Sequence, residues 1–187
     1  MRSVQTFQEF LTDAAKKGDV VNTLFEERLF NLVGVLHKIT DTLSIEGISY
    51  ELIGGLAVLV HVEEANPEYT TLTRDVDLMV CRSDLERIKE IDAKNGFRFR
   101  LVFSGERVRP EQAMPNPPIA PEKKRIHGKE IMIIPVPDLL RMKLSSYRDK
   151  DRVHVRSMDA AGLITPETEG KLSNDLLARL QHVRRTE

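Results

Sequence analysis

Two adjacent glycines, Gly54 and Gly55, lie inside an otherwise apolar stretch of the chain, YELIGGLAVLVH at 50–61. Residues 48–53 are rich in β-branched and aromatic side chains, which is typical of a strand. Residues 55–61 lack the polar alternation of a half-buried strand, which favours a buried helix over the second strand of a hairpin. The glycines then form a strand-to-helix turn, whose backbone N–H groups can bind an anion because no Cβ blocks a phosphate. The alternative is a tight turn with no ligand.

The composition is that of an ordinary globular protein, with 187 residues of which 41% are hydrophobic and 30% are charged. The net charge of -1 excludes a global basic field for nucleic acid. No apolar run approaches the roughly 20 residues that a membrane helix needs, and the N-terminal residues lack the apolar core of a signal peptide. The lone Cys81 allows no internal disulfide, which fits a reducing compartment. We therefore expect a cytoplasmic protein that does not enter a membrane.

Hydrophobic periodicity predicts a mixed order of helices and strands. We expect an α/β (α+β) fold of the nucleotidyltransferase-like type, in which helices flank a mixed central sheet of about four strands and the C-terminal third is helical. Residues 104–125 hold five prolines and read as a long irregular connection. The apolar run 131–134 indicates a central strand. The expected helices are 6–17, 20–46, 55–61, 83–95, 138–149, 150–162 and 165–185, and the expected strands are 48–53, 74–80, 97–103 and 130–136.

These elements divide the chain into three parts of one domain. Residues 1–47 are expected to be N-terminal helices that pack on the core, and residues 48–135 form the α/β core itself. Residues 136–187 are expected to be a C-terminal helical segment that completes the same domain.

A pair of carboxylates, Asp75 and Asp77, lies on the predicted strand 74–80. Side chains at positions i and i+2 of a strand point to the same face, so two negative charges lie close together. A divalent cation removes their repulsion, and Mg²⁺ is often held by one or two carboxylates together with substrate phosphates. The alternative is two solvent-facing acids that pair with Arg74 and nearby bases.

A strongly basic segment, 141–156, follows the last predicted strand and suits phosphate contacts. The alternative for at least half of its cations is a solvated helix face, with Asp138, Asp149 and Asp151 as ion-pair partners. The cations of the segment are Arg141, Lys143, Arg148, Lys150, Arg152 and Arg156.

The stretches LIGGLAVLVH…TLTRDVDLMV and PVPDLLRMKLSSYRDKDRVHVRSM resemble nucleotidyltransferases of the DNA polymerase β-like superfamily, in the version typical of AbiEii-type abortive-infection toxins. The family pattern is a strand, Gly-Gly or Gly-Ser, a helix, a loop, and Arg-x-Thr-x-Asp-h-Asp or a close variant. In this chain the last part reads TLTRDVD at 71–77, with a slightly different order of Thr and Arg. The family's downstream helix carries a Lys followed by a Lys/Arg-Asp pair, which matches Lys143 and Lys150-Asp151. The resemblance covers roughly residues 48–160.

The resemblance implies a role for each matching residue. It places the triphosphate on Gly54, Gly55 and Lys143, the metal (Mg²⁺ or Mn²⁺) on Asp75 and Asp77, and Asp151 as a candidate base or positioning acid. Arg74 and Arg148 are further candidate nucleotide contacts.

Enzymes of this superfamily usually carry a third carboxylate on a following strand, often as the general base. The next predicted strand, 97–103, contains two arginines and no acid. Glu106 and Glu130 are the nearest acids that can substitute by geometry. This departure supports an alternative in which the chain binds nucleotide or a partner without catalysis.

The leading hypothesis is therefore an enzyme that transfers a nucleoside monophosphate from an NTP to a hydroxyl group and releases pyrophosphate. The resemblance makes a tRNA end one candidate acceptor, in the setting of a toxin–antitoxin system, beside another RNA, a protein side chain or a small molecule. A catalytically degenerate nucleotide-binding or interaction protein on the same fold, and a protein with no ligand at all, are the competing hypotheses. The sequence leaves the base preference, the oligomeric state and any protein partner open.

Overall fold

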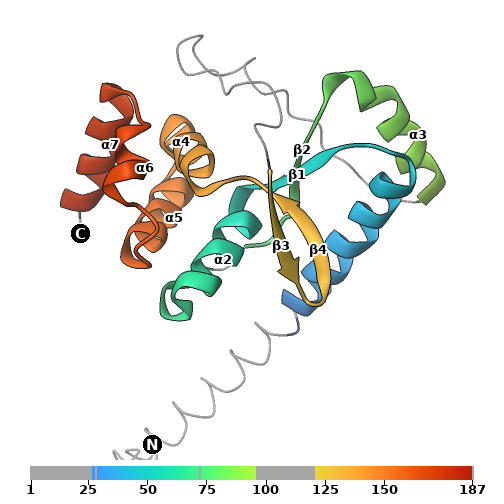
Figure 1. The fold of residues 1–187 in the computed structure, drawn as a ribbon, viewed down its shortest axis with the longest axis horizontal. Coiled ribbons are helices and arrows are strands. Elements are labelled where there is room, and N and C mark those ends of the chain that lie inside the picture. The colour runs from blue at the N-terminus through green and yellow to red at the C-terminus, as the bar shows by residue number, and fades with distance from the viewer. Residues whose placement is uncertain (1–26, 28, 72, 96–120, 187) are drawn as a thin grey trace, which may run out of the picture.

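A mixed four-stranded sheet lies at the centre of the computed structural model, which describes residues 27, 29–71, 73–95 and 121–186. The strand order is β2-β1-β4-β3 (Figure 1). β1 pairs with β2 in an antiparallel and with β4 in a parallel arrangement, while β3 and β4 form an antiparallel hairpin. The strands are β1 (Tyr50–Ile53), β2 (Asp77–Val80), β3 (Glu122–Ile126) and β4 (Lys129–Ile133).

Helices flank the sheet and make up the C-terminal part of the fold, as the sequence predicts. A helix over 29–45 precedes β1, and α2 follows β1 directly. The four helices α4 to α7 lie together beside the sheet (Figure 1). The helical elements are α2 (Gly54–Ala65), η1 (Pro67–Tyr69), η2 (Arg82–Asp84), α3 (Leu85–Asn95), α4 (Val136–Ser146), α5 (Asp149–Ala160), α6 (Pro166–Gly170) and α7 (Asn174–Arg185).

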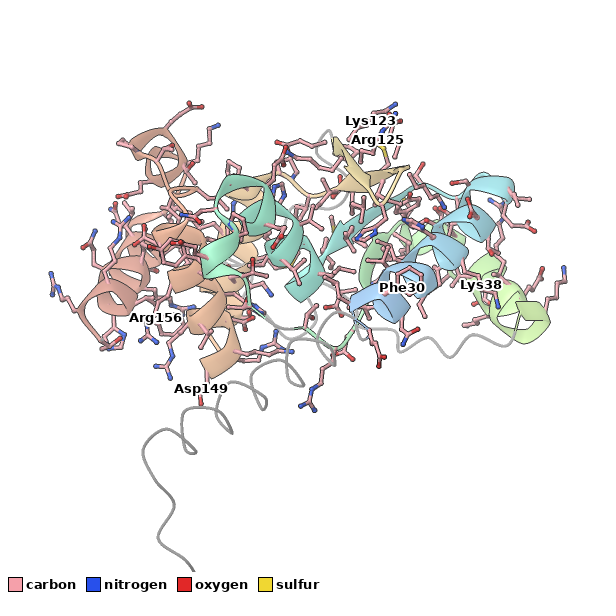
Figure 2. The ribbon with its side chains drawn as sticks, turned by 90° about the horizontal axis from the view of Figure 1, so that it is seen from below. Phe30, Lys38, Lys123, Arg125, Asp149 and Arg156 are labelled. Carbon is pink, nitrogen blue, oxygen red and sulfur yellow. The ribbon has the colours of Figure 1, made fainter. Side chains whose placement is uncertain are left out.

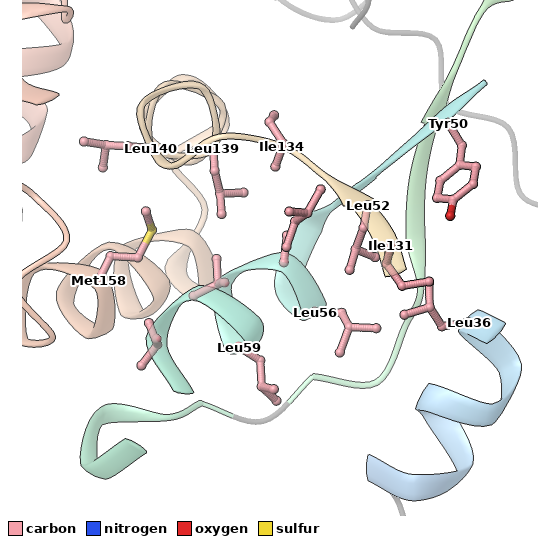
Figure 3. Packing of buried hydrophobic residues seen from close by; sticks show 14 of the residues in the cluster. Leu36, Tyr50, Leu52, Leu56, Leu59, Ile131, Ile134, Leu139, Leu140 and Met158 are labelled. Atoms are coloured by element: carbon pink, nitrogen blue, oxygen red, sulfur yellow. The ribbon is translucent and has the colours of Figure 1, made fainter. Parts of the chain in front are cut away.

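One face of the sheet carries the hydrophobic core. Leu52 and Ile131 point from this face toward Leu36 of the first described helix and toward Leu56 of α2 (Figure 3). These side chains are fully buried, and burial of one Leu or Ile side chain stabilises the fold by about 2 kcal/mol. The core continues to α4 and α5 through Leu139, Leu140 and Met158 (Figure 3).

The other face of the sheet carries charge. Asp77 lies opposite Ile53 in the antiparallel register, and opposite residues of such a pair point to the same side. Glu51 is two residues before Ile53, so its side chain shares that side. Leu52 points to the core face instead, because successive side chains of a strand alternate.

Most predicted elements are present, and two predictions are wrong. Residues 55–61 form part of a helix, and β4 is an interior strand, as expected. Part of the predicted irregular connection is strand β3, whose run of charges, EKKRI, suits an exposed sheet edge and conceals a strand from apolar periodicity. The single helix predicted over 165–185 is two helices, α6 and α7, because Ser173 caps a new helix by accepting from the Leu176 N–H.

The predicted helix 6–17 and strand 97–103 lie outside the described residues. Within the described ranges, no helix has the length and apolar character to cross a membrane.

Candidate functional site

The Gly54 turn and Asp77 form one packed unit. Gly54 adopts φ +74, a left-handed conformation that side chains other than glycine rarely adopt. A Cβ on Gly54 would lie 2.0 Å from Oδ2 of Asp77. The glycine is therefore required by its own backbone conformation and by the close approach of a carboxylate. The sequence pattern explains the glycine by the close approach of a phosphate. In the structure, the carboxylate of Asp77 already occupies the space where a Cβ on Gly54 would lie.

Gly55 makes the same kind of contact with two other residues. A Cβ there would lie 2.5 Å from Oγ1 of Thr73 and 3.4 Å from Cε1 of His154. Thr73 comes from the loop before β2, and His154 comes from α5. The Gly-Gly turn thus joins three parts of the chain that are far apart in the sequence.

Asp77 is the first residue of β2 and is exposed to solvent. Arg74 and Asp75 are also exposed and precede the strand, which begins three residues later than predicted. Among the residues that the structure describes, Asp75 and Asp77 make no salt bridge, so the predicted pairing with Arg74 is not formed. Within the described ranges, no hydrogen bond or salt bridge joins Arg74 or Asp75 to the turn.

A buried carboxylate, Asp151, holds two cations where α4 meets α5. Its Oδ2 accepts from Nε of Arg148 at 2.7 Å, and its Oδ1 lies 3.4 Å from Nζ of Lys143. Ser146 donates to the same carboxylate at 2.7 Å. These donors outweigh the effect of burial and hold the pKa of Asp151 at about 2. A carboxylate with this many donors is a poor proton acceptor, so its geometry favours the positioning role over the base.

The corner between α4 and α5 explains why these residues meet. α4 ends at Tyr147, which has φ 49 and a left-handed conformation, and Arg148 is the N-cap of α5. Asp151 accepts from the Arg148 backbone N–H at 3.2 Å, as in a capping box. The local fold therefore requires Asp151 to be an acceptor, and the same acid fixes the Arg148 side chain.

Lys143 and Arg148 lie within electrostatic range of Asp77. The Lys143 side chain is only 4% exposed, and this burial lowers its pKa, against the opposing attraction of Asp151 and Asp77. The hydrogen bond that Arg148 donates to Asp151 raises the pKa of Arg148, and the negative charge of Asp77 adds to that effect. The Arg148 side chain is 59% exposed and uses only part of its five N–H donors on Asp151, so the others are open to a ligand.

Most of the remaining basic segment is engaged elsewhere. Arg141 pairs with Asp138 at 2.5 Å, and Arg152 pairs with Asp149 at 2.5 Å. Arg156 donates to the Thr186 carbonyl. Figure 2 shows Asp149 at the start of α5 and Arg156 further along the same helix. The expectation that Asp138, Asp149 and Asp151 serve as ion-pair partners is confirmed.

Among the residues that the structure describes, Nδ1 of His154, which lies against Gly55, and Oγ1 of Thr71, on the loop before β2, are buried without a hydrogen-bond partner. His154 is 7% exposed, and burial, together with the positive charge of Lys143, lowers its pKa to about 4. The imidazole is therefore neutral at pH 7. In the sequence, only its place near the end of the basic segment distinguishes His154 from an ordinary surface or core histidine.

The predicted substitutes for a third carboxylate do not join the site. Glu106 lies outside the described residues. Glu130 is exposed and pairs with Lys123 at 2.7 Å. In the register of β1 and β4, Glu130 is about four residues before the level of Asp77, which is about 13 Å along the strands.

Sequence reasoning missed Glu51 of β1. This carboxyl is 2% exposed, and its Oε1 has no hydrogen-bond partner among the described residues. The signal was available, since Glu51 is the single acid of the strand that leads into Gly-Gly.

The donor set fits a hard divalent cation that shares its ligands with a substrate. Asp77 and Asp75 are exposed carboxylates two residues apart, and neither is neutralised by a salt bridge within the described part of the chain. Mg²⁺ needs only one or two such carboxylates when phosphates and water complete its shell. The described ranges contain no group of three or more His, Cys, Asp or Glu side chains that could hold a metal ion unaided.

No protein-family model and no curated protein matches the chain. A function for the chain must therefore be argued from the residues of the site.

Proposed function

We propose that the chain is a magnesium-dependent nucleotidyltransferase, which transfers a nucleoside monophosphate from an NTP to a hydroxyl group. The observation that carries the proposal is the convergence of the Gly54 turn, the Asp77 carboxylate and the cations Lys143 and Arg148. An anion-binding helix start, a metal-binding carboxylate and two cations are the parts that transfer from a triphosphate requires.

Each residue has a distinct task in this proposal. The first N–H groups of α2, at Gly54 and Gly55, and the open donors of Arg148 bind triphosphate oxygens. Lys143 balances negative charge from its buried position beside Asp77. Asp151 positions both cations. Asp75 and Asp77 would hold Mg²⁺ or Mn²⁺, which when bound polarises the phosphate oxygens and the attacking hydroxyl.

The direct test follows the two ends of the triphosphate. Each NTP, labelled either at the α- or at the γ-phosphate, is incubated with the protein, Mg²⁺ and pooled tRNA, and label in the acceptor is counted. The proposal expects α-label and no γ-label in the acceptor. Asp77→Asn should lower transfer at least 100-fold, whereas the exposed Asp175→Asn on α7 should leave it unchanged. Incorporation of γ-label would show phosphoryl transfer and contradict the proposal.

A second candidate is a protein that binds nucleotide without transferring it. The observation in its favour is that the described residues contain no group of three or more His, Cys, Asp or Glu side chains that could hold a metal ion. This candidate predicts magnesium-dependent NTP binding that Asp77→Asn removes, together with no label transfer to RNA, protein or small hydroxyl compounds.

A further inference from the structure

A buried carboxyl without a partner is rare, because burial of a polar group that forms no hydrogen bond costs about 1–3 kcal/mol. Three acids of the described core are buried: Glu51, Asp138 and Asp151. Asp151 is bound by three side chains, and Asp138 pairs with Arg141. Within the described part of the chain, Glu51 is the one acid of these three with a buried oxygen, Oε1, that has no hydrogen-bond partner.

The position of Glu51 relates it to the site. β1 places Glu51 directly opposite Met79 and Ile53 directly opposite Asp77. All four side chains lie on the same face of the sheet, opposite to the face of Leu52. Glu51 and Asp77 are therefore diagonal neighbours, separated by about 7 Å along adjacent strands. A hydroxyl group bound between these two carboxyl groups would be within reach of both.

Transfer to a hydroxyl needs a group that accepts its proton. Asp151 is a poor candidate because its oxygens are occupied by donors. Asp75 and Asp77 are assigned to the metal. His154 is neutral and lies against Gly55, on the side of the turn where the triphosphate would bind.

We propose that Glu51 is the general base of the transfer. The acceptor O–H bond breaks, and its proton passes to Glu51. The hydroxyl oxygen forms a bond to the α-phosphorus, and the bond from the α-phosphorus to the bridging oxygen breaks, so that pyrophosphate leaves with the electron pair. This inference rests on the proposed function.

The environment of Glu51 suits this task. Burial, with a smaller contribution from the nearby charge of Asp138, raises the pKa of the Glu51 carboxyl. A higher pKa makes a carboxylate a stronger proton acceptor. It also means that ionised Glu51 destabilises the fold at neutral pH, since the stability associated with a raised pKa is lost as pH rises through it.

The experiment measures label transfer and stability on the same variants. Glu51→Gln should reduce transfer of α-label from NTP to pooled tRNA by about 10²- to 10⁴-fold, which is the usual worth of a general base. Its magnesium-dependent NTP binding should change less than threefold. Its unfolding midpoint in urea at pH 7 should rise, because the neutral amide removes a buried charge. Glu51→Asp should retain part of the activity, with a shifted acid limb in the pH–rate profile.

Glu130→Gln is the matched control. Glu130 points to the same face of the sheet as Glu51, but it is exposed and lies about 13 Å along the strands from the level of Asp77. The substitution should leave transfer unchanged. Unreduced transfer in Glu51→Gln, or loss of transfer in His154→Gln but not in Glu51→Gln, would overturn the assignment. A lower unfolding midpoint for Glu51→Gln would indicate a structural role and would also overturn it. A wild-type chain that binds no NTP and transfers no label contradicts the proposed function itself.

Discussion

The two ends of helix α5 carry ionic clusters of similar chemistry and opposite design. At its start, Asp151 faces two cations, Lys143 and Arg148, so positive charge is in excess. At its end, Asp159 and Glu169 share one cation, Arg184, at 2.7 and 2.9 Å. The second cluster joins α5, α6 and α7, and both of its carboxylates are paired with Arg184. In the first cluster, Arg148 keeps N–H donors that Asp151 does not use, and the cluster lies within electrostatic range of Asp77.

This difference separates a structural from a functional use of the same residue types. The Arg184 guanidinium forms two hydrogen bonds of 2.7 Å to Asp159, which is the geometry of a closed ion pair. Arg148 meets Asp151 with one good bond of 2.7 Å and one of 3.3 Å, and most of its side chain stays in solvent. In the free protein Asp77 offsets part of this positive charge, and the same two cations match a polyphosphate.

Removal of the central acid should affect the two clusters unequally. Asp151→Asn leaves Lys143 buried without its counter-charge, and we expect the free energy of unfolding to fall by about 3 kcal/mol. Asp159→Asn removes a partly exposed pair and should cost about 1 kcal/mol or less. Urea denaturation at pH 7 measures both values. Equal losses would mean that burial does not distinguish the clusters.

Two buried histidines, His61 on α2 and His154 on α5, have a lowered pKa and should both make stability depend on pH. The pKa of His154 is lowered to about 4 from an ordinary 6.5, so the unfolded chain takes up the proton first. Stability should be complete above pH 6.5 and should fall by a few kcal/mol as the pH decreases toward 4. His154→Gln should flatten this slope in urea denaturation series, whereas Arg184→Ala should leave it. Parallel curves for wild type and His154→Gln would contradict the account. A further loss between about pH 4 and 2 belongs to Asp151.

The Gly54 turn can be compared with a left-handed glycine outside the site. Gly162 has φ +78, and nothing lies within 4 Å of the place of its Cβ, whereas Gly54 has φ +74 and faces Asp77. Gly162→Ala should cost about 1 kcal/mol for backbone strain alone. Gly54→Ala should cost about 2–3 kcal/mol and weaken metal-dependent NTP binding, because Asp77 must move. Thermal denaturation and NTP titration separate these outcomes. Equal losses of stability in Gly54→Ala and Gly162→Ala, with unchanged NTP binding, would show that the contact between Gly54 and Asp77 has no role in the site.

Substitution of Arg148 and of Arg184 should give the smallest changes in free energy of these comparisons. Arg148→Ala should weaken NTP binding about tenfold, equivalent to about 1.4 kcal/mol. It should also lower stability, because the buried Asp151 carboxylate loses a hydrogen bond. Arg184→Ala should lower stability slightly and leave binding unchanged. Calorimetric titration with each magnesium–NTP complex tests both, and a reversed pattern would show that the clusters have been assigned the wrong way round.

Local patterns in the sequence were sufficient for the strand-to-helix turn at Gly54, the interior position of β4 and the break between α4 and α5. They were insufficient where tertiary packing decides. The edge strand β3 is charged and shows no apolar period. Helix α6 ends at Gly170, and Ser173 caps a second helix within a continuous amphipathic pattern. Glu51 became a candidate general base only when the register placed it diagonal to Asp77. Residue spacing and composition do not reveal which strands pair or in which register.

The central claim is that the Gly54 turn, Asp77, Lys143 and Arg148 form one nucleotide site. Calorimetric titration of the wild-type chain with each NTP, with and without Mg²⁺, tests this claim most directly when it is repeated on Asp77→Asn. The account predicts binding of at least one NTP that requires Mg²⁺ and is weakened tenfold or more by the substitution. Binding that is independent of Mg²⁺ and equal in the two proteins, or no binding of any NTP, would contradict it.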